Sequence, residues 1–353
     1  MTETVLVGLS GGVDSAVAVK LLQNDGYKVK GLFLEMLTDN DFSRAEELAR
    51  QLKIDLLKKD VKERFQREIV QDFVKRYSTG LTPNPCVLCN PQIKFKYLLE
   101  TAGELGINNV ATGHYVQKIR KEKHFTLKKA KDETKDQSYF LYKLKQEVLQ
   151  KIKFPLGGLL KEEVREIASK EGLKVPKSES QDVCFLQEGR LEYFLKKNLP
   201  DKYFQSGDIL DEEGRKVGKH RGLVVYTIGQ RKGLDVGGDG PFYVVAKDWR
   251  NNILQVSRRQ GDLEKEKIYF SKTNWLIDSP RKDKKYRIKI RYQMKEVLTT
   301  LKRIGEQRWL ALPERNLRAV TPGQSLVVYD EDELVGGGII SDDNFKVNKK
   351  DKK

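Results

Sequence analysis

The chain has 353 residues, enough for two or three domains with substantial cores. Lysine and arginine total 67 against 51 aspartates and glutamates, and the resulting charge of +16 favours a polyanionic partner, with nucleic acid as the leading class. Apolar runs are too short to cross a membrane, and three cysteines are too few for a secreted disulfide framework. We therefore expect a cytoplasmic protein without a membrane partner.

The first 202 residues alternate strand-like and helix-like segments. Short apolar runs predict strands at 5–7, 29–34, 55–58 and 109–112. Apolar residues at helical spacing predict helices at 16–22, 42–52, 61–77, 92–105, 146–149, 161–171 and 191–197. This alternation predicts an α/β domain over residues 1–202, with a parallel sheet covered by helices on both faces. In that architecture ligands bind beyond the carboxyl ends of the strands.

From about residue 203, short strands separated by glycines replace the helices. Residues 206–210 and 240–245 are examples, and the pattern lasts to Ile340. It predicts two small all-β domains, barrels or sandwiches, at 203–265 and 266–345. The lysines of residues 346–353 form a basic tail that we interpret as a solvated terminus.

A glycine-rich run, Gly8-Leu9-Ser10-Gly11-Gly12-Val13-Asp14-Ser15, separates the first strand from the first helix. Adjacent glycines let the backbone approach an anion, which the N–H groups of a helix N-terminus can then bind. Ser10 and Ser15 add hydroxyl donors, and Asp14 can hold a Mg²⁺ that bridges phosphate oxygens. The run is neither a Walker loop nor a G-x-G-x-x-G loop. It resembles the pyrophosphate loop of adenylating enzymes, which cleave ATP to AMP and pyrophosphate; an ordinary glycine turn is the alternative.

The three cysteines lie in polar segments of the α/β part. Cys86 and Cys89 form a C-x-x-C motif, and the prolines on both sides of Asn84 predict an extended loop there. Cys184 lies in a second predicted loop. A structural zinc site needs a fourth ligand, and the sequence has no fourth cysteine. Catalytic thiols, a three-cysteine iron–sulfur site and ordinary core thiols remain open.

Residues 285–292 combine apolar and basic side chains in alternation. Tyr286, Ile288 and Ile290 alternate with Arg287, Lys289 and Arg291. The pattern predicts a strand with one apolar and one basic face. The basic face could follow the phosphates of a nucleic acid, with a solvated strand face as the alternative.

Seven segments, in order and with compatible spacing, resemble the tRNA-specific 2-thiouridylase (MnmA) family over nearly the whole chain. They are Gly8–Ser15, Thr82–Asn90, Ala111–Tyr115, Lys135–Tyr139, Ser180–Phe185, Tyr226–Gly233 and Arg318–Gln324. The resemblance implies an adenine nucleotide alpha hydrolase-like first domain and a central β domain that contacts tRNA. It also implies the conversion of the wobble uridine of tRNA anticodons to 2-thiouridine.

In the reaction that this resemblance implies, ATP adenylates the C2 oxygen of uracil and releases pyrophosphate. A protein-bound sulfur then attacks C2 and expels AMP. Cys184 would carry the sulfur as a persulfide, supplied by a sulfur-donor protein of a cysteine desulfurase relay. Cys89 would assist its release and could end in a Cys89–Cys184 disulfide. Some relatives have Asp at the position of Cys86, so a [4Fe-4S] cluster on Cys86, Cys89 and Cys184 stays open as a second sulfur route.

The resemblance also implies which residues contact the substrates. The ATP contacts are Gly8, Leu9, Ser10, Gly11, Gly12, Val13, Asp14, Ser15, Leu34 and Gly113. The contacts of the target base are Asn84, Pro85 and Cys86. The tRNA contacts are His114, Lys135, Asp136, Gln137, Arg291, Tyr292 and Gln324. Taken alone, Leu34 could equally be a core leucine, and 135–137 a solvated turn.

Two other functions would use the glycine loop. A small-molecule amidating ligase would adenylate its substrate, but it needs an ammonia source and leaves the cysteines and the basic β domains without a role. An RNA-binding protein with a nucleotide-dependent switch would bind tRNA and form no AMP. Release of pyrophosphate that depends on added tRNA separates both from a thiouridylase.

Overall fold

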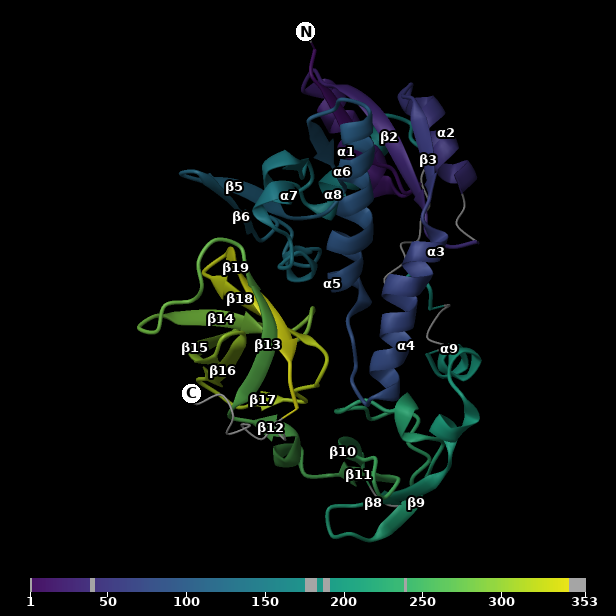
Figure 1. Ribbon diagram of the computed structural model, residues 1–353, viewed down its shortest axis with the longest axis vertical. Helices are drawn as coiled ribbons and strands as arrows, with labels where there is room; N and C mark the ends of the chain where they lie inside the picture. The colour runs from purple at the N-terminus through teal and green to yellow at the C-terminus, as the bar shows by residue number, and fades with distance from the viewer. Residues whose placement is uncertain (1, 39–41, 175–182, 187–190, 238–239, 343–353) are drawn as a thin grey trace.

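The computed structural model describes residues 2–38, 42–174, 183–186, 191–237 and 240–342. An α/β domain is followed by a small β sheet and a β barrel (Figure 1). Within these ranges no helix combines the length and apolar character needed to cross a bilayer. Residues 180–182 of the family-like segment around Cys184, and the basic tail 346–353, lie outside the described ranges.

A parallel sheet with strand order β3-β2-β1-β4-β7 forms the centre of the first domain. Its strands are β1 (Thr4–Gly8), β2 (Lys28–Glu35), β3 (Leu56–Asp60), β4 (Asn109–Ala111) and β7 (Ile152–Lys153). Helices α1 (Val13–Asn24) and α2 (Phe42–Leu52) pack on one face, and α6 (Phe95–Glu104) packs on the other. Because both faces are covered, residues 5–7 of β1 are fully buried. The predicted α/β fold class is confirmed.

Two long helical segments extend from this sheet toward the β domains (Figure 1). The first consists of α3 (Lys62–Phe65), the π-helical turn η1 (Gln66–Val70) and α4 (Gln71–Ser78), where the sequence predicts a helix at 61–77. The second consists of α5 (Pro85–Cys89), the π-helical turn η2 (Asn90–Lys94) and α6. Single π turns within α-helices are rare and are common at functional sites.

The loop predicted for the C-x-x-C motif is wrong beyond Asn84. Cys86 and Cys89 lie in α5, which continues through η2 into α6. Pro85 lies in the first turn of α5, where its missing N–H would have no partner and its fixed φ suits a helix. The chain is therefore extended at Asn84, and the helix begins at Pro85.

The other helices of the α/β domain lie around these layers. They are α7 (Gln146–Lys151), α8 (Lys161–Lys170), α9 (Leu191–Asn198) and the short turns η3 (Ser138–Phe140) and η4 (Asp201–Phe204). Helix α8 packs against α1 through apolar side chains that include Val17 and Val164. The predictions at 146–149, 161–171 and 191–197 are thereby confirmed as helices.

The second domain is a four-stranded sheet with strand order β10-β11-β8-β9. Its strands are β8 (Gly207–Leu210), β9 (Lys216–His220), β10 (Tyr243–Asp248) and β11 (Ile253–Ser257), with the short turn η5 (Leu223–Val225) beside them. Ile209, Tyr226 and Leu254 belong to its own buried cluster. This domain lies next to the far end of the first long helical segment, where α4 contacts η5 (Figure 1).

The third domain is a barrel, closed because β13 pairs with both β16 and β19. Its strands are β13 (Ile268–Trp275), β14 (Lys285–Lys289), β15 (Val297–Gly305), β16 (Arg308–Pro313), β18 (Ser325–Asp330) and β19 (Glu333–Ile340). The turn η6 (Gln260–Leu263) and the short pair β12 (Glu264–Lys265) and β17 (Leu317–Arg318) precede and flank it. The prediction of two all-β domains is confirmed.

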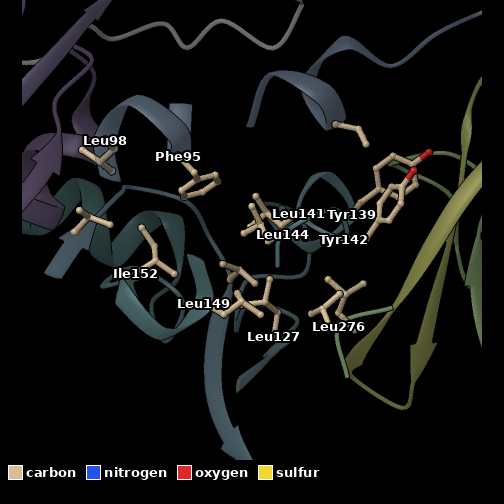
Figure 2. Close-up of a cluster of buried hydrophobic side chains, with 14 of the residues drawn as sticks. Phe95, Leu98, Leu127, Tyr139, Leu141, Tyr142, Leu144, Leu149, Ile152 and Leu276 are labelled. Atoms are coloured by element: carbon tan, nitrogen blue, oxygen red, sulfur yellow. The ribbon is translucent and has the colours of Figure 1, made fainter. Parts of the chain in front are cut away.

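A hairpin of the α/β domain extends the barrel sheet, a feature that the sequence did not predict. Its strands are β5 (Gln117–Lys121) and β6 (His124–Lys128), and Leu127 of β6 pairs with Leu334 of β19. The α/β domain and the barrel also share one hydrophobic core, in which the Tyr139 and Tyr142 hydroxyls point toward the barrel (Figure 2). Tyr139 Oη donates to the Ser325 carbonyl at 2.9 Å.

Buried ion pairs connect the same two domains. Lys129 Nζ lies 2.6 Å from Glu296, and both side chains are almost covered. Lys289 lies 3.9 Å from Glu296 and 4.0 Å from Asp136. The expectation of a basic strand face at 285–292 is therefore wrong for Lys289: Arg287 and Arg291 are exposed, but Lys289 faces carboxylates and ends the strand.

We expect Glu296→Gln to lower the free energy of unfolding by about 3 kcal/mol, because it leaves two covered lysines without their shared carboxylate. Lys285→Gln is the matched control, since it breaks an exposed pair with Glu314 and should cost less than about 1 kcal/mol. Denaturant unfolding followed by circular dichroism measures both. Equal losses in the two variants would contradict the role given to the buried pairs.

Candidate active site

The loop between β1 and α1 is held by its own hydrogen bonds. Ser15 Oγ accepts from the Ser10 backbone N–H at 3.2 Å and donates to the Gly12 carbonyl at 3.0 Å. Gly11 has φ +84°, a backbone conformation that favours glycine. The side chains of Leu9 and Val13 are buried, so these two residues can offer a ligand only their backbone groups. The loop is therefore preformed as an anion cradle at the N-terminus of α1.

The residues that follow β4 meet this loop directly. Strand β1 lies between β2 and β4, which makes its carboxyl end a topological switch point. A Cβ at Gly113 would lie 2.8 Å from the Ser15 nitrogen and from the Asp14 carbonyl carbon, so no side chain fits there. Leu34, near the end of β2, is half-buried among apolar side chains. The predicted ATP residues thus lie at the carboxyl ends of three adjacent strands. Gly8–Ser15 end and follow β1, Leu34 lies near the end of β2, and Gly113 follows β4.

Lys161 and Tyr115 complete this part of the site, and sequence reasoning missed both. Asp14 Oδ1 accepts from Lys161 Nζ and from Tyr115 Oη, each at 2.7 Å. Lys161 is 5% exposed and begins α8, where the helix dipole disfavours a cation. A lysine at that unfavourable position is the one sequence signal that could have indicated a partner carboxylate.

The three cysteines approach one another at the second helical segment. All are free thiols: Cys89 is buried, Cys86 is half-buried and Cys184 is exposed. Burial raises the pKa of Cys89 to about 12 and also raises the pKa of Cys86, while the Lys94 ammonium opposes both shifts. Desolvation by the surrounding protein likewise raises the pKa of Cys184, and Lys94 again opposes the shift. One cation therefore lies within electrostatic reach of three thiols.

The segment that carries Cys184 is attached by an aromatic cluster. The ring of Phe185 lies 5.9 Å from that of Phe65 and 5.1 Å from that of Phe73, which belong to the first long helical segment. Among the residues that the structure describes, no three His, Cys, Asp or Glu side chains are arranged to hold a metal ion. The described side chains therefore show no preformed metal site, and the iron–sulfur route stays a prediction.

His114 connects the nucleotide loop with the cysteines. It follows Gly113, its Nδ1 lies 2.8 Å from Thr112 Oγ1, and its ring stacks on Phe95 at 5.6 Å. Burial, together with the nearby Lys94 ammonium, lowers the pKa of His114 to about 3. The imidazole is therefore neutral at physiological pH, and it cannot attract phosphate as a cation.

The segment 135–137 is tied into the domain. Asp136 is 3% exposed, and its carboxylate accepts from the Ala130 backbone N–H at 3.1 Å and from Ser138 Oγ at 2.7 Å. Gln137 Oε1 accepts from the Tyr115 backbone N–H at 2.9 Å. These bonds hold the turn that carries Lys135, which is half-buried.

The structure brings the barrel to the chain that precedes the cysteines. Gln324 Nε2 donates to the Thr82 carbonyl at 2.9 Å, and the Thr82 N–H donates to the Pro322 carbonyl at 2.9 Å. Asn84 follows as the cap of α5 and is half-buried, whereas Pro85 is buried. Gln324 thus lies beside the segment predicted to contact the target base.

Arg291 and Tyr292 lie on the connection after β14. Arg291 is exposed, and its Nη2 donates to the Arg318 carbonyl at 3.0 Å. The Tyr292 ring lies 4.6 Å from the ring of Phe140, which belongs to η3 of the α/β domain. Burial raises the pKa of Tyr292 to about 12, so its hydroxyl stays protonated as a hydrogen-bond donor. Both residues therefore lie near the junction of the barrel and the α/β domain.

Three family models match consecutive parts of the chain. The tRNA methyl transferase HUP domain matches residues 3–188, the tRNA methyl transferase PRC-barrel domain matches 192–258, and the aminomethyltransferase beta-barrel domain matches 265–340. These matches follow the order of the α/β domain, the four-stranded sheet and the barrel.

Curated relatives match over nearly the full length. The tRNA-specific 2-thiouridylase MnmA 2 of Thermoanaerobacter sp. (strain X514) is 42% identical over 95% of this chain and 97% of that protein. MnmA 1 of Caldanaerobacter subterraneus subsp. tengcongensis is 43% identical over 95% of this chain and 97% of that protein. MnmA of Bacillus subtilis (strain 168) is 39% identical over 96% and 95%. The sequence matches and the fold agree, and the chain belongs to the tRNA-specific 2-thiouridylase family.

Proposed function

We propose that this protein uses ATP to replace the C2 oxygen of the wobble uridine in tRNA with sulfur. One observation carries the proposal. His114 follows Gly113, whose backbone meets the nucleotide loop, and its ring stacks on Phe95 of the helical segment that carries Cys86 and Cys89. An anion cradle and a group of thiols therefore lie on adjoining parts of one domain. The names of the curated relatives support the same activity.

The nucleotide loop would serve the first step. Backbone N–H groups at the N-terminus of α1 bind phosphate oxygens, and Ser10 adds a hydroxyl donor. The uracil O2 attacks the α-phosphorus, pyrophosphate leaves, and N3 gives its proton to solvent water. Lys161 holds Asp14 and would share that carboxylate with any Mg²⁺ that accompanies ATP.

The cysteines would serve the second step, after a sulfur-donor protein has placed a persulfide on Cys184. The terminal sulfur attacks C2, and AMP leaves with the original O2. The Cys89 thiolate then attacks Cys184 Sγ and breaks its bond to the transferred sulfur. This releases the thiocarbonyl, N3 regains a proton, and a Cys89–Cys184 disulfide remains for an external thiol to reduce. Cys184 is exposed, which suits loading by another protein, and Cys89 is buried, which protects its thiol.

The tRNA would lie across the junction of the barrel and the α/β domain. Arg291 supplies an exposed cation and Lys135 a half-buried one, while Tyr292 and Gln324 supply an aromatic ring and an amide beside the α5 entrance. An anticodon loop presents unstacked bases that such side chains can hold. The target uridine must leave its stack to reach Asn84, Pro85 and Cys86.

We expect Gly113→Ala to lower tRNA-dependent release of pyrophosphate about a hundredfold, because a Cβ there displaces the backbone of the nucleotide loop. Gly103→Ala is the control, since a Cβ at Gly103 meets only open space. A coupled pyrophosphate assay with saturating tRNA measures both variants. Normal release by Gly113→Ala would show that the contact with α1 does not position ATP.

Cys184→Ser and Cys89→Ser should each abolish thiolation and leave the first turnover of tRNA-dependent pyrophosphate release nearly unchanged, because adenylation precedes sulfur transfer. Mass spectrometry of the tRNA nucleosides measures the 2-thiouridine formed. Cys86→Ser should retain a substantial part of the thiolation, since the persulfide route uses only the other two thiols as sulfur groups and serine keeps a small polar side chain beside the target base. Substantial turnover by either of the first two variants would reject the role given to that cysteine.

The sulfur route itself is tested on protein purified without oxygen, with iron, sulfide and thiolation assayed on one sample. We expect full thiolation from iron-free protein supplied with a persulfide donor. Stoichiometric iron, together with activity that a chelator destroys, would instead make Cys86, Cys89 and Cys184 cluster ligands.

A further inference from the structure

Two polar groups on the π-helical turn η2 have no partner among the residues that the structure describes. Asn90 is 2% exposed, and its Nδ2 donates to the Phe140 carbonyl at 3.2 Å. That bond sets the orientation of the amide and leaves Asn90 Oδ1 as a buried acceptor without a donor. A buried acceptor without a donor is costly and rare in folded proteins. Its presence beside Cys89 therefore indicates a place for a ligand donor.

Lys94 is the second group. It is partly buried, and within the described ranges no carboxylate or hydrogen-bond acceptor pairs with its ammonium, in contrast to Lys161, which is held by Asp14. Lys94 therefore offers an ammonium with unused hydrogen-bond donors at the end of the turn that follows Cys86 and Cys89.

The helix geometry places Asn90 and Lys94 on the same side of the helical segment. In η2 the Phe95 N–H donates to the Asn90 carbonyl, five residues back, so residues four to five apart lie above one another. Asn90 also follows Cys86 by four residues, which places both on one face of the helix. Cys86, Asn90 and Lys94 therefore follow one line along the segment whose start is expected to contact the target base.

We propose that Asn90 and Lys94 read the edge of the target uracil, with Asn90 Oδ1 accepting from N3–H and Lys94 Nζ donating to O4. This inference depends on the proposed function. The uracil edge presents an acceptor, a donor and an acceptor, and the unpartnered groups of η2 match the donor and one acceptor. O2 is left free for adenylation. When N3 loses its proton, the ammonium, which has three donors, can also bond N3.

The same pair would reject cytosine. Cytosine presents a lone pair at N3 and an amino group at C4, so acceptor would face acceptor and donor would face donor. A site built from buried polar groups discriminates strongly against a ligand that leaves them unpaired. The pair would therefore determine base specificity at the target position, independently of the contacts to the tRNA backbone.

The test compares two tRNAs that differ only in uridine or cytidine at the target position, in single-turnover assays of pyrophosphate release. We expect the wild-type enzyme to prefer uridine at least a thousandfold. Asn90→Ala and Lys94→Met should each lower that preference by about tenfold to a hundredfold, mainly through slower reaction of the uridine tRNA. Gln92→Ala, an exposed residue of the same turn, should leave the preference unchanged.

The ratio separates recognition from folding, because a destabilised variant loses both reactions in parallel and keeps its preference. Parallel losses in Asn90→Ala and Lys94→Met would therefore overturn the proposal. Persulfide loading of Cys184 without tRNA is the second readout. We expect Lys94→Met to slow this loading only in part, because the Lys94 ammonium opposes the raised pKa of Cys184. Lost loading with an intact preference for uridine would assign Lys94 to the sulfur and overturn its role in base recognition. A wild-type enzyme that releases pyrophosphate equally with both tRNAs would reject this inference alone, whereas no release with uridine tRNA would reject the proposed function.

Discussion

The contact between the backbone at Gly113 and the N-terminus of α1 is the constraint on which the site depends. The strand order places β4 beside β1, and the residues that follow the two strands meet without space for a side chain. On one side of this contact lie Asp14 and Ser15, the last residues of the nucleotide loop. On the other side His114 follows Gly113. Lys161, the first residue of α8, donates a hydrogen bond to Asp14 and so also holds the loop. The position of the loop relative to the cysteine helix follows from this arrangement.

The barrel is joined to the α/β domain by features that allow little independent movement. A strand pairing, a common hydrophobic core and buried ion pairs cross the junction, and the Gln324 loop bonds the chain just before α5. Such an interface is more extensive than the polar contacts typical of mobile domains. The junction therefore fixes the residues proposed to hold tRNA relative to the helix that carries Cys86 and Cys89.

The region around Cys86 and Cys89, for which we propose sulfur transfer, combines covered thiols with two polar groups that have no partner within the described ranges. These groups are Asn90 Oδ1 and the Lys94 ammonium. Burial disfavours the thiolate forms of Cys86 and Cys89, and Lys94 is the cation that offsets part of this cost. The buried Asn90 oxygen adds an unmet hydrogen bond. Proteins keep such costly features where a ligand completes them. The energetics of these side chains and the chemistry proposed for them therefore agree.

Local patterns in the sequence determined the α/β class, the glycine loop, most of the helices and the segments that carry the cysteines. These predictions succeed because helical spacing, apolar runs and glycine turns depend on residues close together in the chain. The helix at Pro85 was missed because proline suits both an extended segment and a first helical turn, and only the packed continuation into α6 decides between them. Lys289 was misread because strand alternation is the same whether a lysine faces solvent or the carboxylates of Asp136 and Glu296.

Tertiary structure alone decided the rest of the site. Lys161 and Asp14 are 147 residues apart, and no local pattern connects them. The pairing of the 117–128 hairpin with the barrel joins segments about 200 residues apart, and it depends on side-chain packing across a domain junction. The unpartnered Asn90 oxygen is recognisable only when every neighbouring donor is placed. The sequence therefore determined which chemical groups the protein has, whereas long-range packing decided which of them meet, because contacts between distant residues leave no periodicity in the chain.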